Sequence, residues 1–305
     1  MNWFSGNKLH RLSDTGSRPG TQTTSRQGLI VGTGRCGTTI LAQILNNHTH
    51  IVVPPELQFI IRLHGTNIKH LGAEDIASLI KKYCPNELDY YFDYRAYLSV
   101  LQYPVEDLSV FLKGFFHAIC QYYGKSILLE QTPWHGQYLP LLNSLFSGLC
   151  VIHMVRDPRD VVLSFMRTPY WGDITFEVGI RRWEKEVLRI RHHGQLMGRR
   201  FIEIRYEDLI LSPRETLTGI IDVLDLNYEE AILDPDRLID YRAFSKDAAS
   251  SLKYQSPGYL KWMGNKQRLF FYDNVHGWKK HPDYTCIRKT AEIIGKTMAM
   301  YGYEV

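Results

Sequence analysis

"GLIVGTGRCGTTILAQILNNH", residues 28–48, is the stretch that decides the fold of this protein. The apolar run over 28–33 ends in glycine and predicts a buried strand, and the apolar spacing over 38–47 predicts a helix. A glycine-rich turn between a strand and a helix brings backbone N–H groups and the positive end of a helix dipole to one point. The stretch therefore predicts an α/β fold with an anion site, although such a turn taken alone also fits a purely structural role.

The loop in this stretch differs by one residue from the P-loop of nucleotide-triphosphate enzymes. That pattern is G-x-x-x-x-G-K-[ST], and Gly32, Gly37 and Thr39 fit it. Thr38 stands where the lysine would be, and Arg35 places a cation inside the loop instead. The loop therefore predicts a phosphate-bearing ligand, and the missing lysine disfavours a magnesium-bound triphosphate.

Composition limits the classes of protein that fit. The chain has 305 residues, of which 44% are hydrophobic and 22% charged, as in a soluble α/β protein of one large or two small domains. Its net charge of +4 suits an anionic ligand without requiring nucleic acid, and we expect no nucleic-acid partner. Five scattered cysteines show no metal-ligand spacing, so we expect a reducing, cytoplasmic location and no bound metal.

The N-terminal region has the composition of a tail. Residues 1–26 are rich in Ser, Thr, Gly and Arg and lack the apolar core of a signal peptide. We predict a flexible tail over 1–26 and one domain over 27–305. The sequence has no run of 18 apolar residues, so we expect no insertion into a membrane. No feature of the sequence indicates an oligomeric state.

Apolar runs and helical spacing alternate along the rest of the chain. This alternation predicts a three-layer, P-loop-like α/β fold, with a central parallel sheet flanked by helices. Two aromatic-rich regions, about 55–125 and 229–275, are predicted to be insertions that cover one end of the sheet and shape a substrate pocket, with most of their aromatic side chains packing the fold. The further predicted strands are 126–130, 149–155 and 200–206, and the further helices are 135–146, 174–193 and 284–301.

A second strand-to-helix junction lies in "VIHMVRDPRDVVLSFM", residues 151–166. Asp157 and Pro158 suit the N-cap and first position of the helix, so we assign them structural roles. Arg156 has no such explanation, and it follows a buried strand where ligands bind in open α/β sheets. Ser164, a little over two turns into the helix, would face the same side as Arg156 if the loop folds back, but taken alone it better fits a serine on the helix surface.

Together the two motifs resemble the sulfotransferase superfamily, in its bacterial and Golgi-type branch. Those enzymes use 3′-phosphoadenosine 5′-phosphosulfate (PAPS). "GTGRCGTT" resembles their 5′-phosphosulfate loop, and "VRDPRDVVLS" resembles their 3′-phosphate motif, an arginine with a serine eight residues later. The resemblance runs from about residue 28 to 305. Further similar segments are "NHTHIVVPPE", "EQTPWHGQYLPLLNSLF", "IRYEDLILSPRETLTGIIDVLDL" and "GWKKHPDY" with "YGYE".

The resemblance implies roles for individual residues. Arg35 would stabilise charge on the bridging oxygen, and Glu56 would act as the general base, with His135 and His64 as alternatives. Many relatives carry lysine where this chain has Gln131. The implied PAPS-binding residues are Arg35, Cys36, Gly37, Thr38, Thr39, Arg156, Ser164, Tyr206 and Lys279.

The resemblance predicts an enzyme that moves the sulfuryl group of PAPS to a hydroxyl or amine and releases 3′,5′-adenosine bisphosphate. The acceptor would be a small molecule, a carbohydrate or a lipid, and no metal is expected. A P-loop kinase or NTPase is the first alternative, and Thr38 in place of the lysine disfavours it. A PAPS-binding module without catalysis is the second, and Gln131 keeps it open.

Overall fold

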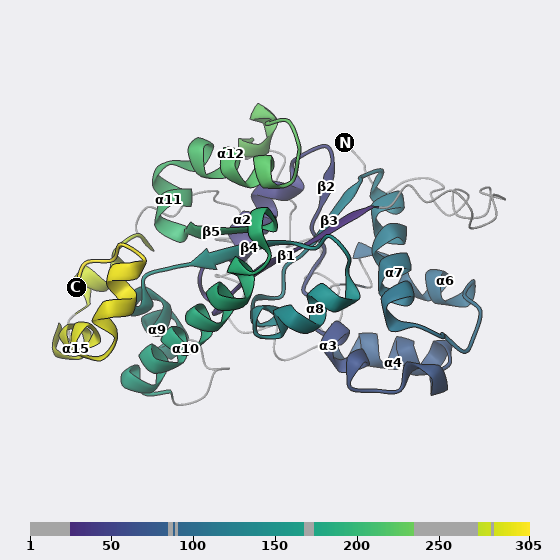
Figure 1. Ribbon diagram of the computed structural model, residues 1–305, viewed down its shortest axis with the longest axis horizontal. Helices are drawn as coiled ribbons and strands as arrows, with labels where there is room; N and C mark the ends of the chain where they lie inside the picture. Colours follow the sequence, from purple (N-terminus) through teal and green to yellow (C-terminus); the bar gives the residue numbers. More distant parts are fainter. Residues whose placement is uncertain (1–24, 85–87, 89–90, 168–173, 235–273, 282–283) are drawn as a thin grey trace.

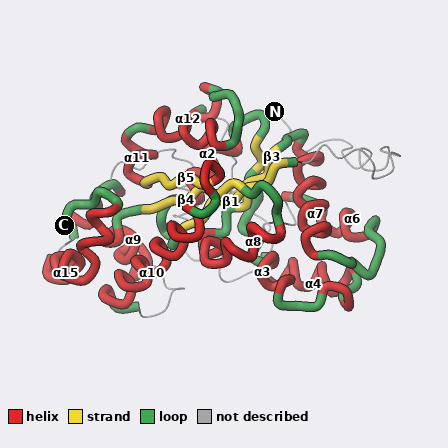
Figure 2. Tube along the Cα trace, viewed as in Figure 1, coloured by secondary structure: helices red, strands yellow, loops and turns green. Residues whose placement is uncertain are grey.

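A five-stranded parallel sheet forms the centre of the computed structural model, which describes residues 25–84, 88, 91–167, 174–234, 274–281 and 284–305. The strand order is β2-β3-β1-β4-β5. Figure 2 shows the strands enclosed by helices on both sides, which is the three-layer, P-loop-like architecture that the sequence predicts. The strands are β1 (Arg26–Gly32), β2 (Ile51–Val52), β3 (Ile127–Glu130), β4 (Cys150–Val155) and β5 (Phe201–Arg205).

The helices of the described residues cover both faces of this sheet (Figure 1). They are α2 (Thr38–Asn46), α3 (Phe59–His64), α4 (Ala73–Tyr83), α6 (Tyr94–Ser99), α7 (Leu108–Tyr123), α8 (Leu139–Leu145), α9 (Pro158–Met166), α10 (Phe176–Gln195), α11 (Tyr206–Leu211), α12 (Pro213–Val223) and α15 (Tyr284–Met300). Short 3-10 turns are η1 (Ile68–His70), η2 (Pro133–Tyr138), η4 (Gly198–Arg200), η5 (Glu230–Leu233) and η9 (Gly277–Lys280).

Alternation along β1 separates two cores. Leu29 and Val31 pack into a core with residues of α7, α8 and α10, whereas Ile30 packs into a second core with α2, α11 and α12. Successive side chains of a strand point to opposite faces, so a strand covered on both sides is apolar throughout. Figure 1 shows α11 and α12 on one side of the sheet and α8, α9 and α10 on the other.

The four predicted strands are all present, with ends within two residues of the prediction. The sequence missed β2, because two residues are too short to show a periodicity. This strand pairs with β3 through Ile51 and Ile127. The first strand begins at Arg26, the last residue of the predicted tail. Residues 1–24 lie outside the described residues, so the tail stays a prediction.

The helix predicted over 135–146 is instead the 3-10 turn η2 followed by α8. Pro140 lies in the first turn of α8 and has no N–H with which to continue a helix from the preceding turn. As a result Tyr138 is 39% exposed, while Leu139 and Leu142 are buried. The prediction of one continuous helix was wrong at this point.

Aromatic side chains of the first predicted insertion pack against one another. Phe92 and Phe115 meet edge to face with ring centroids 5.7 Å apart, and Phe59 meets Phe115 at 5.5 Å. These rings belong to the core that includes Leu29 and Val31 of β1. They therefore pack the fold, as expected for most aromatic residues of this region. Of the second insertion, residues 235–273 lie outside the described residues.

The strand order places the two motifs side by side. β1 and β4 are adjacent, with Gly32 paired to Met154, so their carboxyl ends open at the same edge. From β1 the chain builds β2 and β3 on one side and β4 and β5 on the other. Ligands of open α/β sheets bind in the crevice at such a switch point. The fold thus sets the loop 33–37 beside Arg156.

Lys125 joins the far end of α2 to the sheet. Its Nζ donates to the carbonyl oxygens of Asn46 and Ile51, each at 2.6 Å. Lysine at the last carbonyls of a helix satisfies acceptors that lack helical partners. Burial lowers the pKa of Lys125 from 10.5 to about 8, even though Glu229 acts to raise it.

We predict a pH-dependent stability difference between the wild-type chain and Lys125→Met. The folded state releases the Lys125 proton near pH 8 and the unfolded state near 10.5. Between these values the unfolded state binds more protons, so the free energy of unfolding rises with pH. Urea denaturation at pH 7.5 and 9.5 should show wild type gaining about 1–2 kcal/mol relative to the variant. An unchanged difference would contradict the burial of this amine.

Candidate active site at the carboxyl ends of β1 and β4

Three residues of the loop after β1 have a left-handed backbone conformation. Gly34 has φ 76°, Arg35 has φ 55° and Gly37 has φ 99°. Glycine adopts this region freely, but for arginine it is uncommon and costs about 1 kcal/mol or more. Arg35 is therefore held in a strained backbone conformation at the tip of the loop, as is typical of functional sites.

Gly37 is required by its neighbour as well as by its backbone angle. A Cβ added at Gly37 would lie 2.5 Å from Cδ2 of Tyr206, the first residue of α11. Tyr206 is only 2% exposed, and its ring packs directly beneath the loop. The sequence assigned Tyr206 to the nucleotide, and the structure places its ring against the loop that would hold that nucleotide.

The N-terminus of α2 is open to an anion. Among the described residues no side chain caps it, and its first turn contains no acidic residue. The first N–H groups of a helix have no partner within the helix, and they attract an anion. Thr38 begins this helix and is buried, whereas Thr39 is half-buried. The side chain of Cys36 is fully buried, so this residue offers the site only its backbone N–H.

Burial also makes the Cys36 thiol inert. It raises the pKa of this thiol to about 11, and the nearby backbone N–H groups and the charge of Arg156 oppose this rise only in part. The nucleophile in thiol chemistry is the thiolate. We therefore assign no covalent chemistry to Cys36.

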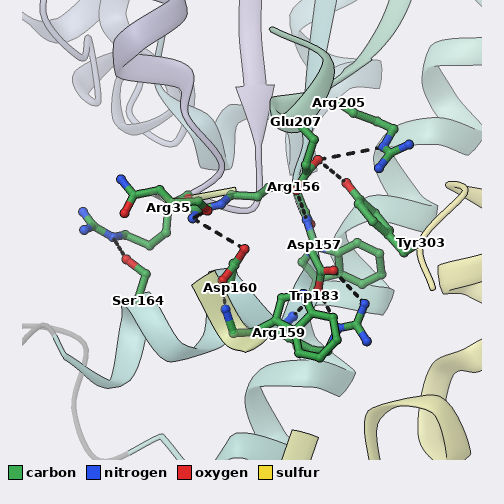
Figure 3. Close-up of polar contacts among 12 residues, drawn as sticks. Arg35, Arg156, Asp157, Arg159, Asp160, Ser164, Trp183, Arg205, Glu207 and Tyr303 are labelled. Atoms are coloured by element: carbon green, nitrogen blue, oxygen red, sulfur yellow. Dashed lines mark hydrogen bonds and ion pairs between the residues drawn. The ribbon is translucent and has the colours of Figure 1, made fainter. Parts of the chain in front are cut away.

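Arg35 links the two motifs through its side chain (Figure 3). Its Nε donates to Oγ of Ser164 on α9 at 3.0 Å. Arg156 reaches back in turn, because its Nη1 donates to the backbone carbonyl of Arg35 at 3.1 Å. Arg35, predicted to act on the bridging oxygen, is thus in direct contact with both residues predicted to hold the 3′-phosphate.

The guanidinium groups of Arg35 and Arg156 make this part of the site strongly cationic. Burial first, and then the nearby charge of Arg156, lower the pKa of Arg35. Arg156 stacks over the ring of Tyr206, with its Cζ 4.5 Å from the ring centroid. Its Nη2 also lies 3.8 Å from Oδ2 of Asp160. Its Nη2 donates to the carbonyl of Asn274 at 2.8 Å. Two like charges close together favour an anion between them.

The predicted general base, Glu56, lies near the carboxyl end of β3. Glu56 is half-buried, and its Oε2 accepts a hydrogen bond from Nε2 of Gln58 at 2.7 Å. The next backbone N–H, that of Leu57, donates to Oε1 of Glu130 at 3.0 Å. Glu130, the last residue of β3, therefore holds the segment that presents Glu56.

Glu130 is a fully buried centre of hydrogen bonds. It accepts from the backbone and the hydroxyl of Thr132, and its Oε2 lies 2.8 Å from Nδ1 of His135. Burial alone would raise the pKa of Glu130, but the charge and hydrogen bond of His135 and the bonds from Thr132 and Leu57 together lower it. The carboxylate is thus engaged inside the protein.

The two alternative bases, His135 and His64, differ in their exposure to solvent. His135 is fully buried against Glu130, so it has no surface through which to meet an acceptor. His64 is exposed at the end of α3. Gln131, in the position of the relatives' lysine, is 7% exposed, and its Oε1 has no hydrogen-bond partner among the described residues.

Lys279 lies in η9 and points to the C-terminal segment. It forms an ion pair with Glu304 at 2.9 Å and is about half exposed. Its Nζ is 5.3 Å from the ring centroid of Trp278. The structure therefore shows Lys279 engaged with neighbours, and its contact with a nucleotide stays a proposal.

Sequence reasoning missed two residues that support Arg156. Trp183 of α10 donates from Nε1 to the backbone carbonyl of Arg156 at 3.0 Å. Glu207 of α11 accepts from the backbone N–H of Asp157, also at 3.0 Å. The signal for Glu207 was present in "IRYEDL", beside Tyr206, but no local pattern reveals that Trp183 lies next to β4.

The described part of the chain shows no candidate metal site and no candidate membrane span. No group of three or more His, Cys, Asp or Glu side chains in this part of the chain is arranged to hold a metal ion. No helix within the described ranges is long and apolar enough to cross a membrane.

Comparison with known proteins identifies the class. The model of the sulfotransferase family matches residues 29–230, about two thirds of the chain. This range contains both loops, Glu56 and the segment that begins at Tyr206. The chain therefore belongs to the sulfotransferase family.

Solved structures share the fold. The sulfotransferase domain of the Synechococcus PCC 7002 olefin synthase superposes with a TM-score of 0.61 at 20% identity, over 95% of this chain and 98% of that one. The sulfotransferase domain from the curacin biosynthetic pathway gives 0.59 at 20% identity, over 93% and 100%. Identities this low establish the fold alone.

Sequence relatives match this chain over a smaller share of their own length than these solved structures do. An uncharacterized protein of Aquifex aeolicus is 23% identical over 216 residues, 67% of this chain. A putative protein-tyrosine sulfotransferase of Caenorhabditis briggsae is 28% identical over 116 residues, 37% of this chain. The chain spans 26% of the length of the first relative and 41% of the second.

We predict that Gly37→Ala destabilises the protein by about 2–5 kcal/mol, because left-handed strain adds to overpacking against Tyr206. Gly148→Ala is the matched control, since its φ is also positive at 76° but an added Cβ meets none of the described atoms within 4 Å. The control should lose only about 1–2 kcal/mol. Urea denaturation measures both values, and equal losses would contradict the packing of Tyr206 on the loop.

Proposed function

We propose that this protein transfers the sulfuryl group of PAPS to a hydroxyl or amine, releasing 3′,5′-adenosine bisphosphate. The observation that carries the proposal is the meeting of the two motifs. The loop of Arg35, the side chain of Arg156 and the hydroxyl of Ser164 converge where β1 and β4 end. Such a site suits a nucleotide with anionic groups at both its 5′ and 3′ positions.

The donor would lie across this convergence. The backbone N–H groups of Gly37, Thr38 and Thr39, at the uncapped start of α2, would hold the 5′-phosphate. Arg156 and Ser164 would hold the 3′-phosphate. Cys36 would contribute a backbone N–H, Tyr206 would support the loop from below, and Lys279 would approach the nucleotide from η9. This donor set consists of amides, hydroxyls and cations.

Arg35 lies between these two subsites. It would stabilise negative charge on the oxygen that bridges sulfur and phosphorus as the S–O bond breaks. Its contact with Ser164 would give way when the nucleotide enters, because an anionic oxygen is a stronger acceptor for a guanidinium than a neutral hydroxyl is.

On the acceptor side, Glu56 is the proposed general base. It would take the proton of the attacking hydroxyl or amine while the new S–O or S–N bond forms. The anchoring of Leu57 by Glu130 supports this role, because it fixes the backbone next to Glu56. Gln131 adds no charge where many relatives have lysine, so Arg35 would carry more of the transition-state stabilisation.

The two alternatives make different demands on the site. A kinase needs an acidic residue free to hold magnesium near the phosphates. Glu130 ends the strand beside β1, but its carboxylate is buried and bonded to Leu57, Thr132 and His135. That engagement disfavours a kinase. A module that binds PAPS without catalysis would need no general base at Glu56. Transfer of labelled sulfate to an acceptor separates this module from an enzyme.

The acceptor and the location are proposals of the same kind. We propose a small-molecule, carbohydrate or lipid acceptor, and the name of the Caenorhabditis relatives adds a protein tyrosine hydroxyl to the candidates. A cytoplasmic location is supported by the cysteines: the side chains of Cys36, Cys84, Cys120 and Cys150 are free thiols.

We predict that 3′,5′-adenosine bisphosphate raises the thermal midpoint of the chain, while Mg-ATP at the same concentration does so far less. A ligand that binds only the folded state stabilises it by mass action. Arg156→Ala should remove most of the shift, because it deletes the cation of the 3′-phosphate subsite. A larger shift with Mg-ATP would refute the proposal and favour the kinase.

We predict that Glu56→Gln lowers kcat by about 100-fold or more without changing the affinity for the bisphosphate. His64→Gln changes the exposed alternative base and should retain full turnover, whereas a loss of turnover in this variant would favour His64 as the base. Radiolabelled PAPS with a panel of phenols, sugars, lipids and tyrosine peptides supplies the assay. Full activity of Glu56→Gln would place the base elsewhere.

A further inference from the structure

One peptide group next to the site is held from both sides. The carbonyl of Arg156 accepts from Nε1 of Trp183, and the N–H of Asp157 donates to Oε1 of Glu207. Both atoms belong to the single peptide unit between residues 156 and 157. Because a peptide unit is planar, fixing its C=O and its N–H fixes the orientation of the whole plane. We call Trp183 and Glu207 the peptide clamp.

The clamp is buried and therefore strong. Trp183 and Glu207 are each 1% exposed. A buried polar group that loses its partner bears the full cost of its own desolvation. The plane of this peptide sets the direction in which the Arg156 side chain leaves the backbone, toward the carbonyl of Arg35 and the ring of Tyr206.

Glu207 is itself held by the C-terminal segment. Its Oε2 accepts from the hydroxyl of Tyr303 at 3.1 Å, and Nε of Arg205 lies 3.8 Å away. Figure 3 shows the chain of contacts from Tyr303 through Glu207 to Asp157. Burial, and then the Glu207 carboxylate, raise the pKa of Tyr303 well above its usual range, so its hydroxyl remains a donor.

A second tyrosine of the C-terminal segment, Tyr301, has different hydrogen-bond partners. Tyr301 also lies against Trp183, with ring centroids 5.9 Å apart, compared with 6.5 Å for Tyr303. The Tyr301 hydroxyl, however, contacts Glu203 at 3.3 Å and the carbonyl of Val187 at 3.5 Å. Neither contact touches the 156–157 peptide. Only the Tyr303 hydroxyl, of these two, contacts Glu207.

We infer that Glu207, oriented by Tyr303, is a positioning residue that aims Arg156 at the 3′-phosphate of the nucleotide. The inference rests on the proposed function, because it takes Arg156 as the ligand of that phosphate. Charged bidentate contacts depend on alignment, so a tilted peptide would weaken the contact to the 3′-phosphate while leaving the 5′ subsite of α2 intact.

The test compares two nucleotides that differ by one phosphate. Isothermal titration calorimetry on the full chain measures the Kd of 3′,5′-adenosine bisphosphate and of 5′-AMP, which lacks the 3′-phosphate. Tyr303→Phe, which keeps the ring and removes only the hydroxyl, should weaken the bisphosphate about 3- to 10-fold. Binding of 5′-AMP should stay within about twofold, because the proposed ligands of the 5′-phosphate are backbone N–H groups at the start of α2 and not the Arg156 side chain.

Tyr301→Phe is the matched control and should leave both affinities unchanged. Glu207→Ala should weaken the bisphosphate further than Tyr303→Phe, and Glu207→Gln should restore much of it, because the amide oxygen still accepts from the Asp157 N–H. The Tyr303→Phe measurement stands even where Glu207→Ala fails to fold.

Three results would overturn the inference. Tyr303→Phe with unchanged bisphosphate affinity would show that the hydroxyl does not reach Arg156. Equal weakening of both nucleotides would show a general structural role. Wild type that binds both nucleotides equally would refute the proposed function itself, and the inference with it, which separates that failure from the other two.

Discussion

The hydrogen bond from Arg156 to the backbone carbonyl of Arg35 is the contact on which the site depends. It joins a loop after β1 to a residue after β4, separated by more than a hundred positions in the chain. The parallel pairing of β1 with β4 makes it possible, because the carboxyl ends of adjacent parallel strands meet at one edge. The two anion-binding elements then act as one site.

Bringing two arginines together at this site costs free energy, and the surrounding structure offsets that cost. Two arginines lie together, one of them in a left-handed backbone conformation, with Arg156 stacked on Tyr206. Strain and like charge of this kind persist where the surrounding structure over-determines them. The ring of Tyr206 beneath Gly37, the hydrogen bond to Ser164 and the hold on the 156–157 peptide provide that support. An incoming polyanion would relieve the repulsion.

Much of the fold could be predicted from periodicity. The strands that are long, apolar and bounded by glycine or proline were found, and Asp157 caps α9 as expected. The misses have local causes. The two-residue β2 is too short to show a pattern, and Pro140 divides the helix predicted over 135–146 into η2 and α8. Trp183 was missed because a tryptophan on an amphipathic helix reads as core, which it also is.

The sequence by itself determined the class of the site: a glycine loop with an arginine in place of the P-loop lysine, and a second arginine with a serine eight residues later. Tertiary structure decided which side chains support these residues. Glu130 holds the backbone beside Glu56, and Glu207 and Tyr303 hold the backbone beside Arg156. The physical reason is that chemistry near a glycine loop is encoded locally, whereas a supporting hydrogen bond is defined only when distant segments pack together.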